Sequence, residues 1–285
     1  MKKIGIVAKP HGREVRLVVK ELLEWLRGKG LEIFFDLDSA ALVGQEGEGY
    51  KKSELPSLVD LLIVLGGDGT LLSVARLVGA RGIPILGVNL GALGFLTEIP
   101  LEELYATLDE VLTDKYQFNE RMMFTAHIHR QGERIAEYSV LNDVVINKGA
   151  LARIIEMETY IDKEYVTTYR ADGLIISTPT GSTAYSMAAG GPIIYPSLQA
   201  LVLTPICPHT LTNRPLVMPN GVRIEVILIS EKEDVYLTLD GQVGFALRYR
   251  DVVEVKSAEN SIKLIRSSHR SYYEVLRTKL KWGER

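Results

Sequence analysis

An apolar run at residues 61–65 ends abruptly at Gly-Gly-Asp-Gly-Thr, residues 66–70. The run predicts a strand buried on both faces, and the amphipathic stretch after it predicts a helix. Glycines such as Gly67 and Gly69 let backbone N–H groups approach a polyphosphate, and the positive end of the helix attracts its charge. Bound phosphate repels a carboxylate, so Asp68 suggests a proton acceptor or an indirect magnesium contact.

The spacing of these glycines matches neither G-x-x-x-x-G-K-[ST] nor G-x-G-x-x-G, so another kind of phosphate chemistry is needed. A simple tight turn is the alternative, because Gly-Asp-Gly turns are common after strands. The position between a strand and a helix favours a ligand site, since ligands in open α/β sheets gather at the C-terminal ends of strands.

The first part of the chain carries a β-α-β pattern. Strands are predicted at residues 4–8 and 31–35, with a helix between them that buries one apolar face. The polar, glycine-rich segment 36–52 is expected to be a mobile loop or the edge of a lid. A further strand at 83–88 ends in a second glycine-bearing turn, residues 89–98, which a parallel sheet would place beside the first turn.

From about residue 115 the pattern changes to short β-like runs separated by turns. We therefore predict an α/β N-terminal domain with a Rossmann-like open sheet, followed by an all-β domain of sandwich type. The last segment has Tyr273, Leu276 and Leu280 at helical spacing and is expected to return to the first domain. The predicted domains are residues 1–114 with 266–285, and residues 115–265.

Several polar groups in the second half could bind a ligand. Asn142 and Asp143 adjoin at the edge of a predicted strand, where a turn or cap is the alternative. Arg170 and Asp172 precede an apolar strand, where a surface ion pair is the alternative. Small hydroxyl residues and glycines dominate residues 179–192, which suits close approach of an extended ligand or a buried crossover with self-satisfied hydroxyls.

Two further groups of side chains bear on function. Tyr185 could stack on a base or simply pack. His127 and His129 alternate along a predicted strand and so share one face, without zinc-type spacing in the sequence. We expect a cross-strand surface pair there. Ser177, Ser182 and Ser186 lack a G-x-S-x-G elbow, which argues against a serine hydrolase.

Composition narrows the class of protein. The chain has 36 acidic and 33 basic residues, so no global field favours nucleic acid or an anionic membrane. No stretch approaches the roughly 18 apolar residues of a membrane span. The single cysteine, Cys207, fits a reducing cytoplasm, and we expect it to be a small buried apolar residue. A cytoplasmic protein without nucleic-acid or membrane partners is expected.

Five motifs together, in this order, resemble the NAD kinase family. They are Gly-Gly-Asp-Gly-Thr at 66–70, the glycine-bearing turn at 89–98, Asn-Asp at 142–143, the block 172–185, and Asp-Gly-Gln at 240–242. The likeness covers roughly residues 4–266. The first motif is shared with diacylglycerol and sphingoid-lipid kinases and, more loosely, phosphofructokinases, whereas the block 172–185 is specific.

This resemblance implies transfer of the γ-phosphoryl group of ATP, with a divalent metal such as Mg²⁺, to the 2′-hydroxyl of the adenosine ribose of NAD. It implies that Asp68 is the proton acceptor and leaves the metal ligands and the use of polyphosphate open. Relatives of this kind form homodimers or homotetramers. The residues it implies for the nucleotide sites are Gly67, Gly69, Asn89, Asn142, Asp143, Arg153, Arg170, Asp172, Thr183, Ala184, Tyr185, Ser186, Met187, Ala188 and Gln242.

Two other functions compete with this one. A lipid kinase would need an apolar acyl groove or a basic membrane-facing patch, and the charge balance suggests neither. A non-catalytic dinucleotide sensor would keep the pocket but not the chemistry, and the intact Asp68 argues against it. The sequence departs from several relatives at Ser73, where they carry a basic or larger residue, so a cationic phosphate contact must come from elsewhere. Arg76 is one candidate, although an arginine there is ordinarily on a solvated helix face.

Overall fold

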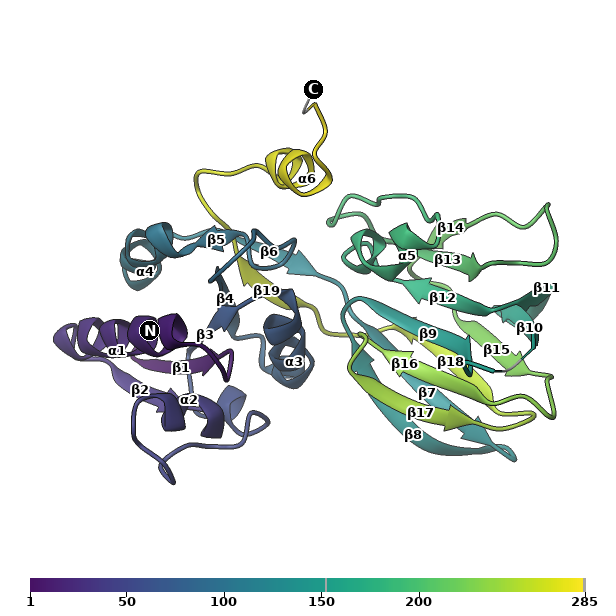
Figure 1. The fold of residues 1–285 in the computed structure, drawn as a ribbon, viewed down its shortest axis with the longest axis horizontal. Helices are drawn as coiled ribbons and strands as arrows, with labels where there is room; N and C mark the ends of the chain where they lie inside the picture. Colours follow the sequence, from purple (N-terminus) through teal and green to yellow (C-terminus); the bar gives the residue numbers. More distant parts are fainter. Residues whose placement is uncertain (152, 284–285) are drawn as a thin grey trace. The chain divides into compact units, whose positions relative to one another are not determined.

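The structure, a computed structural model, describes residues 1–151 and 153–283 (Figure 1). The chain divides into two compact units. Unit 1 comprises Met1–Glu120 together with Ile262–Arg285, and unit 2 comprises Arg121–Ser261.

Unit 1 is built on a mixed sheet whose strands follow the order β2-β1-β3-β4-β19-β6, with β5 beside β4. Every neighbour from β2 to β19 pairs in parallel. The strands are β1 (Lys3–Ala8), β2 (Glu32–Phe35), β3 (Leu61–Gly66), β4 (Pro84–Asn89), β5 (Ile99–Pro100), β6 (Phe118–Arg121) and β19 (Ile262–Ile265). The predicted open α/β sheet is thus confirmed.

Helices cover both faces of this sheet. The α-helices of unit 1 are α1 (Arg13–Gly28), α2 (Leu37–Leu42), α3 (Asp68–Val78), α4 (Leu104–Leu112) and α6 (Tyr272–Leu280). Helices α1 and α4 share one apolar core with Leu86 and Val88 of β4. Side chains alternate along a strand, so position 87, between Leu86 and Val88, faces the opposite side of the sheet. There a Cβ on Gly87 would lie 2.6 Å from Leu71 of α3.

The prediction of a loop over residues 36–52 is wrong for Leu37–Leu42, which form α2. Asp36 caps this helix, because its carboxylate accepts a hydrogen bond from Ser39 N at 3.1 Å. The hydroxyl of Ser39 accepts in turn from Ala8 N at 2.7 Å, which ties α2 to the end of β1. An Asp N-cap is a local signal that outweighs the polar composition of the segment.

The C-terminal segment returns to unit 1, as predicted. Strand β19 pairs in parallel with β4. Helix α6 begins with a capping box in which Ser271 and Glu274 each bond the other's backbone N–H. Just before it, Arg270 pairs with Glu103 at 3.5 Å. The return therefore supplies both a strand and a helix to the first unit.

Unit 2 is the predicted β-sandwich. Two six-stranded sheets follow the orders β11-β10-β15-β18-β7-β8 and β14-β13-β12-β9-β16-β17, and side chains of both sheets form a single apolar core. The strands are β7 (Phe124–Arg130), β8 (Glu133–Val140), β9 (Asp143–Lys148), β10 (Ile155–Ile161), β11 (Glu164–Ala171), β12 (Gly173–Ser177), β13 (Ala200–Ile206), β14 (Leu216–Pro219), β15 (Ile224–Leu228), β16 (Val235–Leu239), β17 (Val243–Leu247) and β18 (Val252–Ser257).

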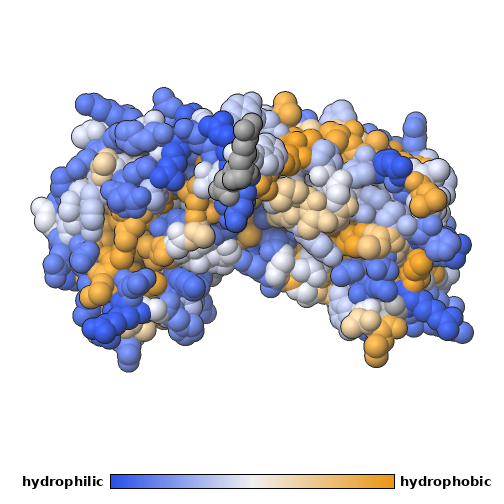
Figure 2. Space-filling view, turned by 45° about the horizontal axis from the view of Figure 1, so that its top comes forward, coloured by the Kyte–Doolittle hydropathy of each residue, from blue (hydrophilic) through white to orange (hydrophobic). Residues whose placement is uncertain are grey.

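On the face shown in Figure 2, hydrophilic residues surround separate patches of hydrophobic ones. In the described part of the chain, no helix has the length and apolar character needed to cross a membrane. Cys207 is exposed, which overturns the expectation of a buried thiol. It directly follows β13 in a turn with a φ of 44°, so the chain leaves the core before the thiol.

Candidate active site

The two glycine-bearing turns lie side by side at the C-terminal edge of the sheet in unit 1. Strands β3 and β4 run parallel, and their last residues, Gly66 and Asn89, face each other in register. The adjacency expected from the sequence is therefore confirmed. Helix α3 begins directly after the first turn, with Gly67 as its N-cap, so its free N–H groups point toward this edge.

Asp68, the first residue of α3, is held by the second turn. Its Oδ1 accepts hydrogen bonds from Leu96 N, Thr97 N and Thr97 Oγ1, each at 3.0 Å. Its Oδ2 accepts one from Phe95 N at 2.8 Å. Four donors from one segment fix both the position and the rotation of this half-buried carboxylate.

The two turns can approach this closely because of glycine. A Cβ on Gly94 would lie 2.1 Å from Asp68 Oδ1 and 2.3 Å from Thr97 Oγ1. A Cβ on Gly66 would lie 2.6 Å from Thr70 Oγ1. All three distances are far inside van der Waals contact, so a larger residue at either position would force the backbone of the turns to shift.

A cleft of about 570 Å³ opens beside these turns. Its wall includes Gly66, Gly67 and Asn89, which the sequence singles out. It also includes Lys9, His11 and Arg13, which sequence reasoning missed; the lining is completed by Gly12, Glu14, Val15, Leu90, Gly91 and Ala92. Their position in the chain could have indicated this role. Residues 9–13 directly follow β1, and the C-terminal ends of parallel strands lie at the same edge of a sheet.

The remaining predicted residues of unit 1 have defined places. The side chain of Asn89 shapes its own turn, because its amide donates to Ala92 O and its Oδ1 accepts from Gly91 N at 2.6 Å. Gly69 is exposed in the first turn of α3. The hydroxyl of Ser73 donates to Thr70 O at 2.7 Å and so bonds to its own helix.

A second cleft, of about 350 Å³, lies in unit 2. It is lined by four residues that the sequence proposes, Asn142, Asp143, Ala184 and Tyr185. The other lining residues are Val145, Asn147, Thr238, Asp240 and Gly241. Strands β9 and β16 are antiparallel neighbours, which brings residues about a hundred positions apart into one wall.

Asp240 organises one side of this cleft. Its backbone has a φ of 51° at the turn after β16. Its carboxylate accepts hydrogen bonds from the backbone N–H groups of Leu141, Asn142 and Asp143, at distances from 2.7 to 3.2 Å. The negative charge of Asp240 is therefore stabilised by three dipoles at the start of β9.

Asp143 has the opposite environment. Its side chain is buried, and burial together with the charge of Asp240 raises its pKa from 3.8 to about 7. Two carboxylates that differ in this way can share one proton. Asp143 can thus donate a hydrogen bond to a ligand at neutral pH as well as accept one.

The hydroxyls of the block after β12 bond to other groups of the protein, some within the block and some outside it. Ser186 shares a hydrogen bond of 2.9 Å with Thr204, and Thr183 Oγ1 donates to Thr180 O at 3.2 Å. Ser182 donates to Pro179 O and accepts from Ile194 N. The short helix α5 (Tyr185–Ala188) then presents backbone and the exposed Tyr185 ring rather than hydroxyls.

A Cβ on Gly181 would lie 2.1 Å from the carbonyl oxygen of Asn142, so this glycine seats the hydroxyl block against the start of β9. Met187 is half-buried, whereas Ala188 and Gln242 are exposed. In the described part of the chain, Met187, Ala188 and Gln242 are not among the residues that line the unit 2 cleft.

Three charged residues that the sequence proposes lie away from the lining of this cleft. Arg170 pairs with Glu156 at 3.1 Å on the surface, and Asp172 pairs with Lys148 at 3.1 Å. Arg153 is exposed. For Arg170 and Asp172 the structure thus contains the ion pairs that were the alternative interpretation.

Glycine turns and a fixed carboxylate on a parallel sheet, in one chain with a polar cleft in a β-sandwich, suit a phosphotransferase that acts on nucleotides. Residues 4–116 match the model of the ATP-NAD kinase N-terminal domain, and residues 141–267 match that of the ATP-NAD kinase C-terminal domain. The chain belongs to the NAD kinase family.

Full-length relatives agree with this assignment. The chain is 56% identical over 285 residues to the NAD kinase of Geobacter sulfurreducens and 55% identical to that of Geotalea daltonii, with 100% of each chain covered. Its fold is similar to that of yeast NADH kinase solved with NADH, with a TM-score of 0.92, 26% identity, and coverage of 100% of this chain and 89% of the yeast chain.

A second solved structure shares the fold. The NAD kinase of Archaeoglobus fulgidus, solved with ATP, superposes with a TM-score of 0.78 at 24% identity and covers 97% of this chain and 99% of its own. The enzyme therefore phosphorylates NAD with ATP, as the sequence predicted. The lipid kinase and the non-catalytic sensor are set aside.

Proposed function

We propose that Asp68 is the proton acceptor for the 2′-hydroxyl of the adenosine ribose of NAD. The difference between its two oxygens carries the proposal, because Oδ1 accepts three hydrogen bonds and Oδ2 accepts one. A carboxylate oxygen can accept about two. Among the residues that the structure describes, Oδ2 thus keeps an acceptor position, which is what a general base needs.

Fixing this carboxylate suits the chemistry. In phosphoryl transfer the protein contributes mainly by positioning the reactants and stabilising charge, and less by forming covalent bonds. The four donors at residues 95–97 hold Asp68 without drawing on a ligand. The base is then preorganised, and binding of NAD need not order it.

The cleft of unit 1 is proposed to hold the phosphates of ATP. Gly67 supplies a backbone without a Cβ at the start of α3, where the helix dipole favours negative charge. Lys9 and Arg13 add two exposed cations to the wall of the same cleft. Lys9 and Arg13 line the described cleft and Arg76 does not, so they are better placed to provide the cationic phosphate contact that a serine at position 73 cannot make.

Mg²⁺ fits this donor set. It keeps several waters and is usually held by one or two carboxylates together with substrate phosphates. Asp68 is the carboxylate at the phosphate turn and would attract the ion by its charge, while the phosphates of ATP supply direct ligands. When bound, the ion would neutralise charge on the β- and γ-phosphates.

The cleft of unit 2 is proposed to bind NAD. Asn142 Oδ1 is buried and lacks a hydrogen-bond partner among the described residues, so it suits an N–H or O–H donor of the ligand. Asp143 can give or accept a hydrogen bond, and Tyr185 offers an exposed aromatic face. Of the sequence-proposed residues in unit 2, these three carry the proposal, with Ala184 allowing close approach.

The test is Asp68→Asn, which keeps shape and removes the base. We expect kcat to fall by at least about a hundredfold, while the Kd for NAD, measured by calorimetry, changes less than threefold. Asp109→Asn, at an exposed carboxylate paired with Lys29, is the matched control and should keep wild-type kcat. Wild-type turnover by Asp68→Asn would show that another group takes the proton.

The oligomeric state, the use of polyphosphate and the location in the cell each have a direct test. A homodimer or homotetramer is expected and can be measured by light scattering. Use of polyphosphate in place of ATP can be tested in the same coupled assay for NADP. The cytoplasmic location predicted from the single cysteine can be tested by fractionation.

A further inference from the structure

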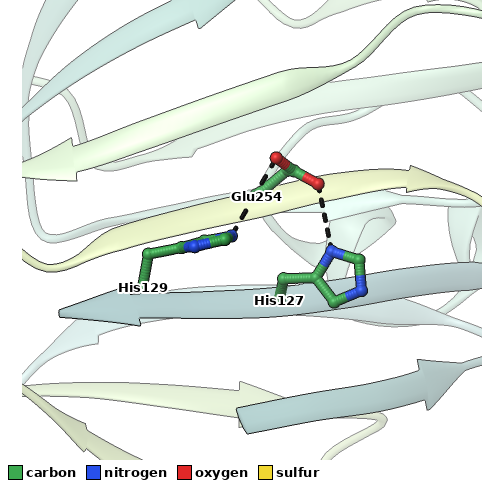
Figure 3. A group of neighbouring side chains, drawn as sticks. All are labelled: His127, His129 and Glu254. Carbon is green, nitrogen blue, oxygen red and sulfur yellow. Dashed lines mark hydrogen bonds and ion pairs between the residues drawn. The ribbon is translucent and has the colours of Figure 1, made fainter. Parts of the chain in front are cut away.

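Three potential metal ligands converge on the outer face of a sheet in unit 2, in a group that the kinase chemistry does not use. His127 and His129 extend from β7, and the carboxylate of Glu254 on β18 lies between them (Figure 3). Each residue offers one ligand atom, and these atoms lie within 4.8 Å of one another. We propose that His127, His129 and Glu254 form a site for Zn²⁺ or a similar transition-metal ion.

The position of these side chains follows from strand pairing. His127 is directly opposite Glu254 on β18 and opposite Glu137 on β8. Neighbours such as Ile128 and Val253 point into the core, so the histidines and the glutamate point outward. Cross-strand neighbours have Cβ atoms about 5 Å apart, which suits side chains that share one ion.

The tautomer of His127 decides which ring nitrogen can bind a metal. Its Nε2 lies 3.3 Å from Glu137 Oε2 and 3.5 Å from Arg134 Nη1, and its Nδ1 lies 3.0 Å from Glu254 Oε1. Metal-binding histidines usually donate the other ring N–H to a carboxylate. With Nε2–H directed to Glu137, the lone pair of Nδ1 faces the carboxylate of Glu254, and a cation between these two acceptors stabilises both.

His129 supports the same position from the other side. Its Nε2 is buried and lacks a hydrogen-bond partner among the described residues, and it lies 4.0 Å from Glu254 Oε2. A buried ring nitrogen without a partner is uncommon, and a metal ion would satisfy it. The imidazole rings are 6.1 Å apart at 84°, so their edges can point to one centre.

The ligand set indicates the kind of ion. Two imidazoles and one carboxylate are a known set for Zn²⁺, with the fourth position open to water. In a tetrahedral site with bonds of about 2.1 Å, ligand atoms lie about 3.4 Å apart. In the structure His127 Nδ1 lies 3.0 Å from Oε1 of Glu254 and His129 Nε2 lies 4.0 Å from Oε2, and the three ligand atoms lie within 4.8 Å of one another, so the side chains would draw together around the ion. Imidazole ligands favour Zn²⁺ over Mg²⁺, so the site would discriminate against the metal of the kinase reaction.

Nearby charges modulate the site. Arg223 is the cation nearest the ligand carboxylate of Glu254 on this face. Arg223 Nη1 lies 3.7 Å from Glu254 Oε2 and competes with a metal for that oxygen. Arg134 Nη1 lies 2.8 Å from Glu137 Oε2 and 3.5 Å from His127 Nε2, so it opposes a proton on Nε2 and thereby the tautomer that binds the metal.

The experiment uses the full-length enzyme, freed of metal with a chelator and dialysed against Zn²⁺ in excess Mg²⁺. We expect one strongly bound Zn²⁺ per chain, a rise in Tm with Zn²⁺ concentration, and visible absorption of four-coordinate type with Co²⁺. Failure of the wild type to bind Zn²⁺ would overturn the proposal.

Variants separate this site from other Zn²⁺ sites. His129→Gln and Glu254→Gln should weaken Zn²⁺ binding at least tenfold and remove the Co²⁺ spectrum, whereas His209→Gln, at an exposed histidine of the same unit, should bind like the wild type. Arg223→Met should tighten binding, a gain that a misfolded variant cannot give. Equal binding by wild type and His129→Gln would show that the ion binds elsewhere.

Discussion

A Cβ on Gly94 would lie 2.1 Å from Oδ1 of Asp68. The absence of a side chain at residue 94 is therefore a condition for the four hydrogen bonds that orient the carboxylate. Because these bonds come from residues 95–97, directly after this glycine, any shift of the turn moves the donors and Asp68 together.

Gly94→Ala should lower kcat by about a hundredfold, since small errors in the position of a catalytic group are costly. Steady-state assays of NADP formation measure this. Gly28→Ala, at the end of α1 with nothing within 4 Å of the added Cβ, is the control and should keep wild-type kcat. Unchanged kcat in Gly94→Ala would mean that the geometry of Asp68 is not limiting.

Lys9 and Arg13 should matter for ATP more than for NAD. Lys9→Met and Arg13→Met are each expected to raise the KM for ATP about tenfold, equivalent to roughly 1.4 kcal/mol, with little change in the KM for NAD. The effect should shrink at high salt, because both cations are exposed. Lys20→Met, on the exposed face of α1, is the control. Equal effects on both substrates would argue against a phosphate contact.

Asp143 should make stability depend on pH. Its pKa is about 7 in the folded protein, against an ordinary 3.8, so the folded state binds the proton more tightly. The resulting stabilisation is complete below pH 4 and is lost as the pH rises through 7. Between pH 5 and 8 the free energy of unfolding should fall by up to about 3 kcal/mol from this group.

Asp143→Asn should remove this pH dependence, as urea denaturation at pH 5 and pH 8 would measure. Asp114→Asn changes an exposed aspartate in a turn and serves as the control. If the wild type and Asp143→Asn lost equal stability over this range, the proton would reside on another group.

Ser186→Ala should act on stability more than on NAD binding. The hydroxyl of Ser186 is buried and bonded to Thr204, and the alanine leaves Thr204 without this partner. We expect a loss of about 1–2 kcal/mol in the free energy of unfolding and a KM for NAD within threefold of wild type. Ser197→Ala, at an exposed serine, should change neither. A large rise in KM with unchanged stability would assign the hydroxyl to the ligand.

Much of this arrangement was predictable from local signals. A wholly apolar run ending in glycines predicted β3 and its turn, and the repetition of that pattern predicted that residues 66 and 89 adjoin. Both predictions rest on short stretches of chain, where the side-chain period and the conformational freedom of glycine decide the structure.

The rest depends on register between distant residues. Nothing near Asp143 in sequence indicates that Asp240, 97 residues away, raises its pKa. Likewise, Lys9 and Arg13 look like ordinary surface residues until β1 is placed beside β3. Sequence reasoning also assigned the hydroxyls of residues 183–186 to a ligand in preference to other groups of the protein, whereas Thr183 bonds to Thr180 and Ser186 to Thr204. The donors and acceptors within a loop are set by its folded path.

Strand β19 lies between β4 and β6, so the sheet of unit 1 is completed by residues near the end of the chain. During synthesis, the ribosome must therefore translate nearly the whole polypeptide before this sheet can close. Unit 2 has all its strands between residues 121 and 261, and domains generally fold as units. Unit 1 therefore begins to be translated first, but it can complete its sheet only after the whole of unit 2 has been translated.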